Sequence, residues 1–228
     1  MIGLIGGIGP ASTLDYYMGI IKGYMEKTGS ENYPEILLHS IDLTEMVSFI
    51  KLDRWDEVIL KLVDSIKMLS DAGAEFAAIA SNTPHIVFDE ILLQSPIPLI
   101  SIVEETCKYI KNAGHNRVLT IGTLFTMKSG LYTEPMKELG VSSLLPSSDE
   151  QARIYSLFFP NLENGIVVPE DKEKMLELVG RIIKEQGADS LLLGCTELPL
   201  MITPEDVSVP IIDTMQIHID SIVSYMTS

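Results

Sequence analysis

Residues 187–199 read GADSLLLGCTELP, and residues 73–84 read GAEFAAIASNTP. Each stretch opens with glycine, alanine and an acidic residue, and continues as a short apolar run. Eight residues after its glycine, each stretch places a small nucleophilic side chain, Ser81 in the first and Cys195 in the second. Ser81 and Cys195 are therefore predicted to hold equivalent positions in two halves of one fold.

The duplication extends along the whole chain, because apolar runs recur in the same order in both halves. The matching runs are 2–7 with 118–123, 36–40 with 143–147, and 97–101 with 209–213. Amphipathic helical patterns over 55–68 and 173–185 separate these runs. Short apolar runs alternating with helices are typical of parallel sheets with crossover helices. We therefore expect an α/β fold of two similar doubly wound parallel-sheet domains.

The expected first domain comprises residues 1–96 plus 208–228, and the second comprises residues 97–207. In this arrangement the chain returns to the first domain for a last helix over 215–226. A chain of 228 residues is long enough to form two modest hydrophobic cores.

Composition excludes several classes of function. The net charge of −16 argues against a nucleic-acid partner, because phosphate binding needs clustered lysine and arginine. No apolar run approaches the roughly 20 residues of a membrane span, so no membrane segment is expected. The chain has only two cysteines, which favours the reducing cytoplasm over a disulfide framework. Its four scattered histidines lack ligand spacing, so no metal site is expected.

Polar residues gather where the predicted strands end, which is where open parallel sheets bind ligands. Hydroxyls and backbone N–H groups beside helix starts can hold a carboxylate. The alternative is that these side chains only cap helices and turns. The residues expected to orient a small anionic ligand are Asn82, Thr83, Thr123, Thr126 and Thr196.

The glycine-rich turn after the first strand is a poor match for a dinucleotide site. Residues 7–12 read GIGPAS, with Ser12 in place of the third glycine or alanine. Pro10 also removes a backbone donor where a pyrophosphate would need one. The sequence therefore argues against a nucleotide cofactor.

Five motifs together resemble the aspartate/glutamate racemase family, in the same order and over essentially the whole chain. They are GGIGPAST at 6–13, NTPH at 82–85, Gly122-Thr123 with Thr126, G-x-Y at 130–132 and LGCTELP at 193–199. The resemblance implies a cofactor-independent amino-acid racemase, a homodimer, whose active site lies between two similar domains. It also implies substrate contacts by Ile8 and Glu197, in addition to the residues given above.

In that family a cysteine from each domain flanks the substrate α-carbon, one removing a proton and the other returning it. A thiol suits this task, because its pKa of about 8.5 can be lowered into the working range. The resemblance makes Cys195 the principal acid/base group and places Ser81 where the second cysteine is usual. Cys107 falls within a helical pattern and is expected to be structural.

Ser81 departs from the paired-thiol scheme, since a hydroxyl is a poor base without an activating partner. Three interpretations stay open: a natural variant, an engineered replacement of a cysteine, and divergence to a reaction that needs one cysteine. His85, four residues on, either packs and caps locally or adjusts the electrostatics of the site.

The substrate side chain is the second open question. The family uses a basic residue after the second strand and another in the second domain, but residues 42–45 read DLTE and residues 161–164 read NLEN. Lys51 is the candidate replacement, with Arg54 and Arg153 as alternatives. Two other functions remain: a single-cysteine decarboxylase or isomerase of the same superfamily, and a catalytically silent amino-acid-binding protein.

Overall fold

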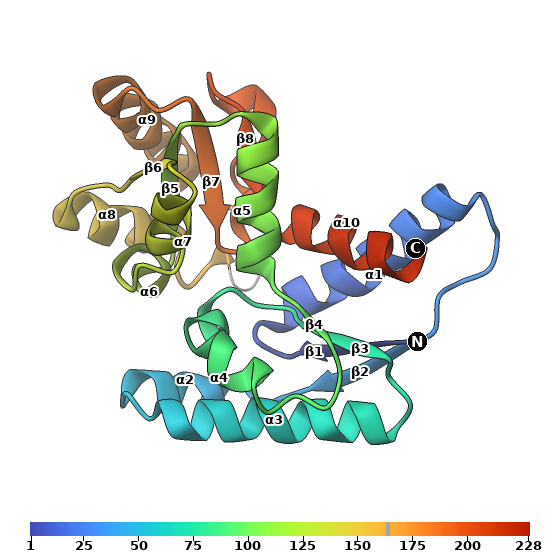
Figure 1. The fold of residues 1–228 in the computed structure, drawn as a ribbon. Coiled ribbons are helices and arrows are strands. Elements are labelled where there is room, and N and C mark those ends of the chain that lie inside the picture. The colour runs from blue at the N-terminus through green and yellow to red at the C-terminus, as the bar shows by residue number, and fades with distance from the viewer. Residues whose placement is uncertain (163–164) are drawn as a thin grey trace. The chain divides into compact units, whose positions relative to one another are not determined.

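The computed structural model describes residues 1–162 and 165–228 (Figure 1). The chain forms two compact units. The first unit contains Met1–Ile102 and His218–Ser228, and the second contains Val103–Ile217. The chain therefore leaves the first unit once and re-enters it near the C-terminus.

The first unit contains a four-stranded parallel sheet in the order β2-β1-β3-β4. Its central strands are buried on both faces, as expected for a parallel sheet covered by helices. The elements of this unit are β1 (Ile2–Gly6), α1 (Pro10–Thr28), β2 (Ile36–Ser40), α2 (Leu43–Lys51), α3 (Trp55–Asp71), β3 (Phe76–Ile79), η1 (Thr83–Val87), α4 (Phe88–Leu92) and β4 (Leu99–Ile100).

The second unit repeats this topology, with a parallel sheet in the order β6-β5-β7-β8. Two helices cross the boundary between the units: α5 (Ile102–Ala113) enters the second unit, and α10 (Thr214–Met226) returns to the first. The other elements are β5 (Arg117–Gly122), α6 (Leu124–Lys128), α7 (Thr133–Glu138), β6 (Ser142–Leu144), α8 (Ser148–Phe158), α9 (Pro169–Gln186), β7 (Ser190–Gly194), η3 (Leu198–Leu200), η4 (Pro204–Asp206) and β8 (Ile211–Asp213).

These sheets confirm the expected α/β class with two parallel sheets and interleaved helices. The repeated strand order also matches the sequence duplication element by element. The expected domain boundaries assigned residues 97–101 to the second half and 208–213 to the first. Backbone pairing instead places β4 beside β3 in the first sheet and β8 beside β7 in the second.

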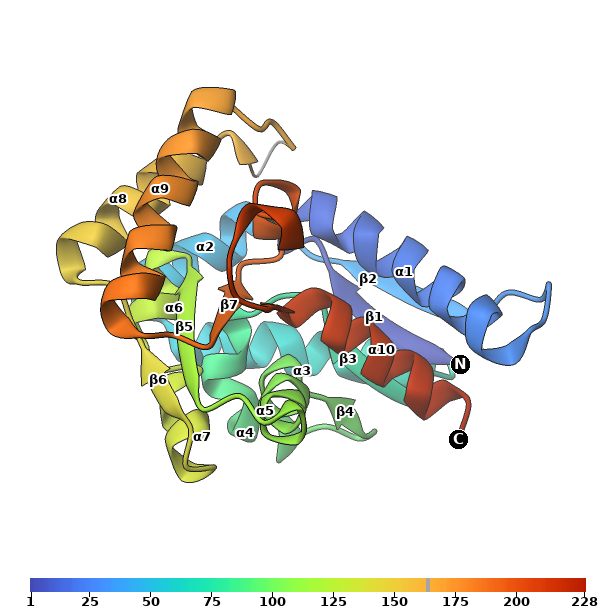
Figure 2. The same ribbon diagram turned by 90° about the horizontal axis from the view of Figure 1, so that it is seen from above.

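Helices cover both faces of the first sheet. Figure 1 shows α3 along one face, with α1 and α10 on the opposite face, and Figure 2 shows α1 and α10 side by side. This approach needs small residues on α1. A Cβ atom at Gly19 would lie 2.8 Å from Ile219 Cδ1, and one at Gly23 would lie 3.2 Å from Val223 Cγ2.

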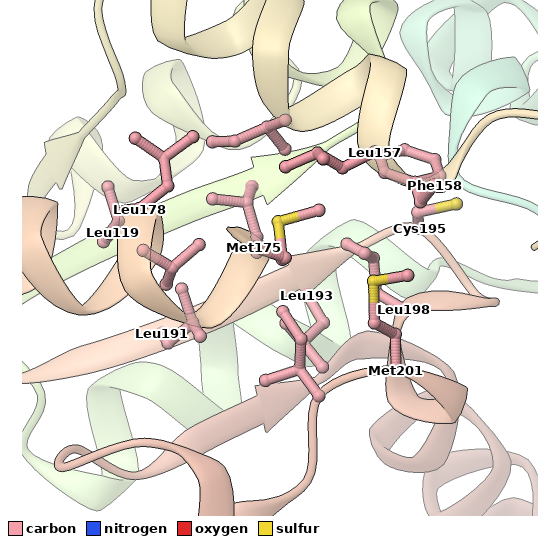
Figure 3. Close-up of a cluster of buried hydrophobic side chains, with 14 of the residues drawn as sticks. Leu119, Leu157, Phe158, Met175, Leu178, Leu191, Leu193, Cys195, Leu198 and Met201 are labelled. Carbon is pink, nitrogen blue, oxygen red and sulfur yellow. The ribbon is translucent and has the colours of Figure 1, made fainter. Parts of the chain in front are cut away.

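The core of the second unit lies between its sheet and the pair α8 and α9. Buried side chains of this core include Leu119, Phe158, Leu178 and Leu193 (Figure 3). Cys195 stands at one end of this cluster, with its sulfur pointing away from Leu178. The core therefore supports the strand end that carries the predicted nucleophile.

The three helices predicted from the sequence over 55–68, 173–185 and 215–226 are confirmed as α3, α9 and α10. α9 has clear end signals: Pro169 occupies its first turn, and Gly187 ends it with a φ of 61°.

None of the helices in residues 1–162 and 165–228 is both long and apolar enough to cross a membrane.

Candidate active site

Cys195 lies directly after the last residue of β7, at the carboxyl end of the second sheet. After β5 the chain builds β6 on one side of that strand and then crosses to build β7 on the other. Ligands of doubly wound sheets bind at such a reversal point, beyond the carboxyl ends of the strands. The predicted nucleophile therefore occupies the position where this topology places a ligand site.

A buried carboxylate contacts the thiol. Cys195 Sγ donates to Glu197 Oε2 at 3.0 Å, and Thr196 Oγ1 donates to the same oxygen at 2.9 Å. Cys195 is 9% exposed and Glu197 is 8% exposed, so little solvent screens the contact. An ionised carboxylate accepts hydrogen bonds and cannot donate them, which favours the protonated form of the sulfur.

The end of β7 is packed tightly against the end of β5, its neighbour in the sheet. Thr126 Oγ1 donates to the carbonyl of Gly194 at 3.2 Å. A Cβ atom at Gly194 would lie 2.8 Å from Thr126 Cγ2, and one at Gly122 would lie 2.9 Å from the Gly194 carbonyl oxygen. Both glycines are therefore needed for this close approach.

Thr123 and Thr126 serve the local structure here. The Thr123 hydroxyl caps α6 by accepting from the Thr126 N–H at 3.1 Å, and the two hydroxyls are 3.0 Å apart. This is the capping alternative considered for the strand-end residues, while their contact with a substrate stays a prediction. Thr214 adds a contact that the sequence did not indicate: its hydroxyl donates to the Leu193 carbonyl at 2.9 Å.

Ser81 has the equivalent position in the first unit, two residues after β3 ends at Ile79. Ala80 still donates to the carbonyl of Ile5 in β1, but the Ser81 N–H turns back to the carbonyl of Ile79 at 2.8 Å. Asn82 and Thr83 follow at the start of η1, and Ser81 and Asn82 are both buried. The backbone therefore leaves the sheet at Ser81.

The predicted turn after β1 is held by a threonine that sequence reasoning did not single out. Gly7, with a φ of 87°, donates its N–H to Thr13 Oγ1 at 2.9 Å, and that hydroxyl donates to the Gly9 carbonyl at 2.7 Å. Ile8 is buried within this turn. The threonine falls one helical turn after Gly9, which is the local signal that could have indicated it.

The imidazole of His85 is hydrogen-bonded to the Ser81 backbone. Its Nδ1 lies 2.9 Å from the Ser81 carbonyl oxygen, and its Nε2 lies 3.4 Å from the backbone nitrogen of Ile102. Burial lowers the pKa of His85 to about 3. Both ring nitrogens are engaged by backbone groups, so His85 is not placed to activate the Ser81 hydroxyl.

Asp42 and Lys51 lie at opposite ends of α2, and Cys107 lies in α5. Lys51 is exposed at the last turn of α2, about 12 Å along the helix axis from its first residue. Asp42 is occupied as the N-cap of α2. Burial raises the pKa of Cys107 to about 12, which fits a structural cysteine. Residues 163 and 164 of the NLEN segment lie outside the described residues.

Among residues 1–162 and 165–228, no group of three histidine, cysteine, aspartate or glutamate side chains is arranged to hold a metal ion.

Comparison with known proteins gives a consistent result. A model of the family described as Asp/Glu/Hydantoin racemase matches residues 5–222. The broad specificity amino-acid racemase RacX of Bacillus subtilis (strain 168) is 28% identical over 219 residues, which are 94% of this chain and 92% of that protein. The glutamate racemase of Aquifex aeolicus (strain VF5) is 31% identical over 139 residues, 58% of this chain and 50% of the relative.

A solved structure agrees over the entire length. The crystal structure of an aspartate racemase homologue from Pyrococcus horikoshii OT3 matches with a TM-score of 0.88 and 34% sequence identity. The match covers 100% of this chain and 99% of that chain.

Proposed function

Because this chain belongs to the Asp/Glu/hydantoin racemase family, we propose that it is a cofactor-independent amino-acid racemase of the aspartate/glutamate type. As a member of a racemase family the protein is an isomerase. The observation that carries the proposal is the buried Cys195 thiol, hydrogen-bonded to Glu197 at the reversal point of the second sheet. An acid/base group at that position suits exchange of a proton on a small bound molecule.

In the proposed reaction, Cys195 transfers a proton to or from the α-carbon of the substrate. As a thiol it donates its proton to the planar carbanion and becomes a thiolate. As a thiolate it removes the α-proton and becomes a thiol again. Glu197 sets the balance between the thiol and the thiolate. Its carboxylate accepts a hydrogen bond from the S–H group and disfavours the negative charge of a nearby thiolate.

Ser81 is the proposed partner on the opposite face of the substrate. Its hydroxyl delivers a proton, or relays one from water, but removes one poorly. Exchange at Cys195 is then faster than inversion of configuration. The same scheme accommodates Ser81 as a natural or engineered substitute for cysteine, since the surrounding backbone contacts do not depend on sulfur.

The substrate class is proposed from two relatives. One is a broad specificity amino-acid racemase, and the other is a glutamate racemase. We propose an amino acid as substrate, with its α-carboxylate held near Ile8, Asn82, Thr83 and Thr196, and with Lys51 as the candidate cation for an acidic side chain. Aspartate and glutamate are accordingly the first substrates to test. We also propose that the protein is a cytoplasmic homodimer. Light scattering on the purified protein tests whether it is a dimer.

The deciding experiment is proton NMR in heavy water with separate L- and D-amino acids, followed by chiral analysis. We expect loss of the α-proton signal, with at least partial inversion. Cys195→Ala should abolish the exchange, whereas the matched variant Cys107→Ala should retain it. No exchange with any amino acid would refute the racemase proposal. Loss of carbon dioxide from a malonate-type substrate would instead favour a decarboxylase, and saturable binding without reaction would favour a silent binding protein.

A further inference from the structure

A chain of buried aromatic side chains runs through the first unit to the backbone of Ser81. Tyr16 on α1 and His218 on α10 have no exposed surface, and the Tyr16 hydroxyl lies 2.8 Å from His218 Nδ1. The His218 and His85 rings pack nearly perpendicular to one another, with ring centroids 6.3 Å apart and an interplanar angle of 85°. His85 in turn stacks on Phe88, with centroids 5.0 Å apart.

The partners of each ring determine where its proton lies. The Ile100 carbonyl can only accept, so His218 Nε2, at 2.9 Å, carries a proton and donates to it. In a neutral His218 ring with its proton on Nε2, Nδ1 accepts the hydrogen bond of the Tyr16 hydroxyl. His218 is thereby held in one orientation by two partners that are far from it in sequence.

His85 has the opposite tautomer. The Ile102 N–H can only donate, so Nε2 of His85 is the unprotonated nitrogen that accepts it. Nδ1 therefore carries the proton and donates to the Ser81 carbonyl. A second proton on this ring would point at the Ile102 N–H, and burial already lowers the pKa of His85.

The two ring nitrogens of His85 are hydrogen-bonded to backbone groups of Ser81 and Ile102. Ile102 is the first residue of α5, and its N–H is one of the donors that a helix start leaves without an intrahelical partner. At Ser81 both peptide groups are constrained, because the N–H is bonded to Ile79 and the carbonyl is bonded to His85. The direction in which the Ser81 side chain leaves the backbone thus depends on the imidazole.

We propose that His85 is a positioning residue for Ser81, and that His218 and Tyr16 hold its ring in place. The inference rests on the proposed function, in which Ser81 protonates one face of the carbanion. The hydrogen bond from Nδ1 fixes the Ser81 peptide, so its loss impairs proton delivery by Ser81. Exchange through Cys195, which belongs to the other unit, does not depend on this bond.

The test compares two replacements that keep different halves of the imidazole. In His85→Asn the side-chain amide replaces Nδ1 and still donates to the Ser81 carbonyl. In His85→Gln the amide lies nearer the place of Nε2, and the bond to Ser81 is lost. In heavy water we expect His85→Gln to lower the ratio of inversion to exchange with retention by about tenfold, the equivalent of one hydrogen bond. We expect His85→Asn to stay within about threefold of the parent.

Coupling to Ser81 separates positioning from general damage to the fold. In a Ser81→Ala background, His85→Gln should cause no further loss of inversion, because the group that it positions is absent. An equal loss in both backgrounds, or a parallel loss of retention exchange, would overturn the inference. A parent enzyme that exchanges no α-proton would overturn the racemase proposal itself, which is a distinct result.

A second measurement needs no variant. Nitrogen-15 NMR of the histidine-labelled parent protein should show His85 as the Nδ1–H tautomer and His218 as the Nε2–H tautomer at neutral pH. Finding His85 protonated at Nε2 would remove the bond to Ser81 and overturn the inference, even if every His85 variant failed to fold.

Discussion

Replacing Glu197 with glutamine removes the charge beside the catalytic thiol proposed here and preserves the shape of the side chain. The Thr196 hydroxyl can still donate to the remaining amide oxygen, so the local structure should persist. The substitution changes the partner of Cys195 Sγ. In the parent protein this sulfur lies 3.0 Å from a carboxylate oxygen of Glu197. A neutral amide no longer favours the protonated sulfur, and its N–H can donate to a thiolate.

The magnitude follows from the contact. A hydrogen bond to a charged group contributes about 1.5–3 kcal/mol, and S–H is a weak donor, so the lower end applies. Since about 1.4 kcal/mol corresponds to a tenfold change in an equilibrium, the thiol of Glu197→Gln should ionise at a pH about one unit lower. At neutral pH the thiolate population should rise about tenfold.

Iodoacetamide reports this population directly, because it alkylates the thiolate and not the thiol. We expect alkylation of Glu197→Gln at pH 7 to be about tenfold faster than that of the parent. Cys107 should not interfere, since burial and the nearby Glu104 raise its pKa to about 12. Glu205→Gln is the matched control, because it changes the net charge equally at an exposed position.

Two results would refute this reasoning. Equal alkylation rates for Glu197→Gln and Glu205→Gln would mean that the carboxylate does not control the ionisation of Cys195. Slower alkylation of Glu197→Gln would mean that Glu197 acts as the base that ionises the thiol, which reverses the proposed sign.

Three further predictions concern the serine, the histidine and the glycines of the strand ends. Ser81→Cys should raise the inversion rate at least tenfold in chiral analysis if two thiols are better than one; normal substrate binding without a gain would contradict the paired scheme. Because His85 has its pKa lowered to about 3, the unfolded chain binds a proton that the folded chain excludes as the pH falls below about 6.5. Stability should therefore decrease on acidification, and urea titrations of His85→Gln between pH 6.5 and 5 should give a slope shallower by up to about 1.4 kcal/mol per pH unit; identical slopes would contradict this. Gly194→Ala should cost about 1–3 kcal/mol, because its Cβ atom would lie 2.8 Å from Thr126 Cγ2. Gly180→Ala, with open space around it in α9, should instead stabilise by about 0.5–1 kcal/mol; equal effects of the two changes in denaturant unfolding would contradict the packing argument.

Much of the architecture was predictable because it is encoded locally. The helical patterns over 55–68 and 173–185 predicted α3 and α9, and the apolar runs before Ser81 and Cys195 predicted β3 and β7. The membership of β4 and β8 was not predictable in the same way. These strands have two and three residues, and pairing alone decides the sheet to which so short a strand belongs.

The candidate site shows the same division. The proximity of Cys195, Thr196 and Glu197 follows from three consecutive residues at a strand end, but the sequence did not show that Glu197 would turn back to the thiol. The sequence marked His85 only as a residue four positions after Ser81, with packing, capping and electrostatic roles left open. The backbone partner of His85 at Ile102 comes from a helix start 17 residues away in the chain.

The sequence by itself determined the duplicated parallel-sheet fold and the equivalence of Ser81 and Cys195, because strand periodicity, glycine turns and helix ends depend on neighbouring residues. Only the tertiary structure decided which groups lie within hydrogen-bond distance of the Ser81 backbone and of the His218 ring. Tyr16 and His218 are 202 residues apart, and neither carries a local signal for the other. Their hydrogen bond forms because folding buries both side chains side by side, and most buried polar groups are hydrogen-bonded to a partner that the packed chain brings to them.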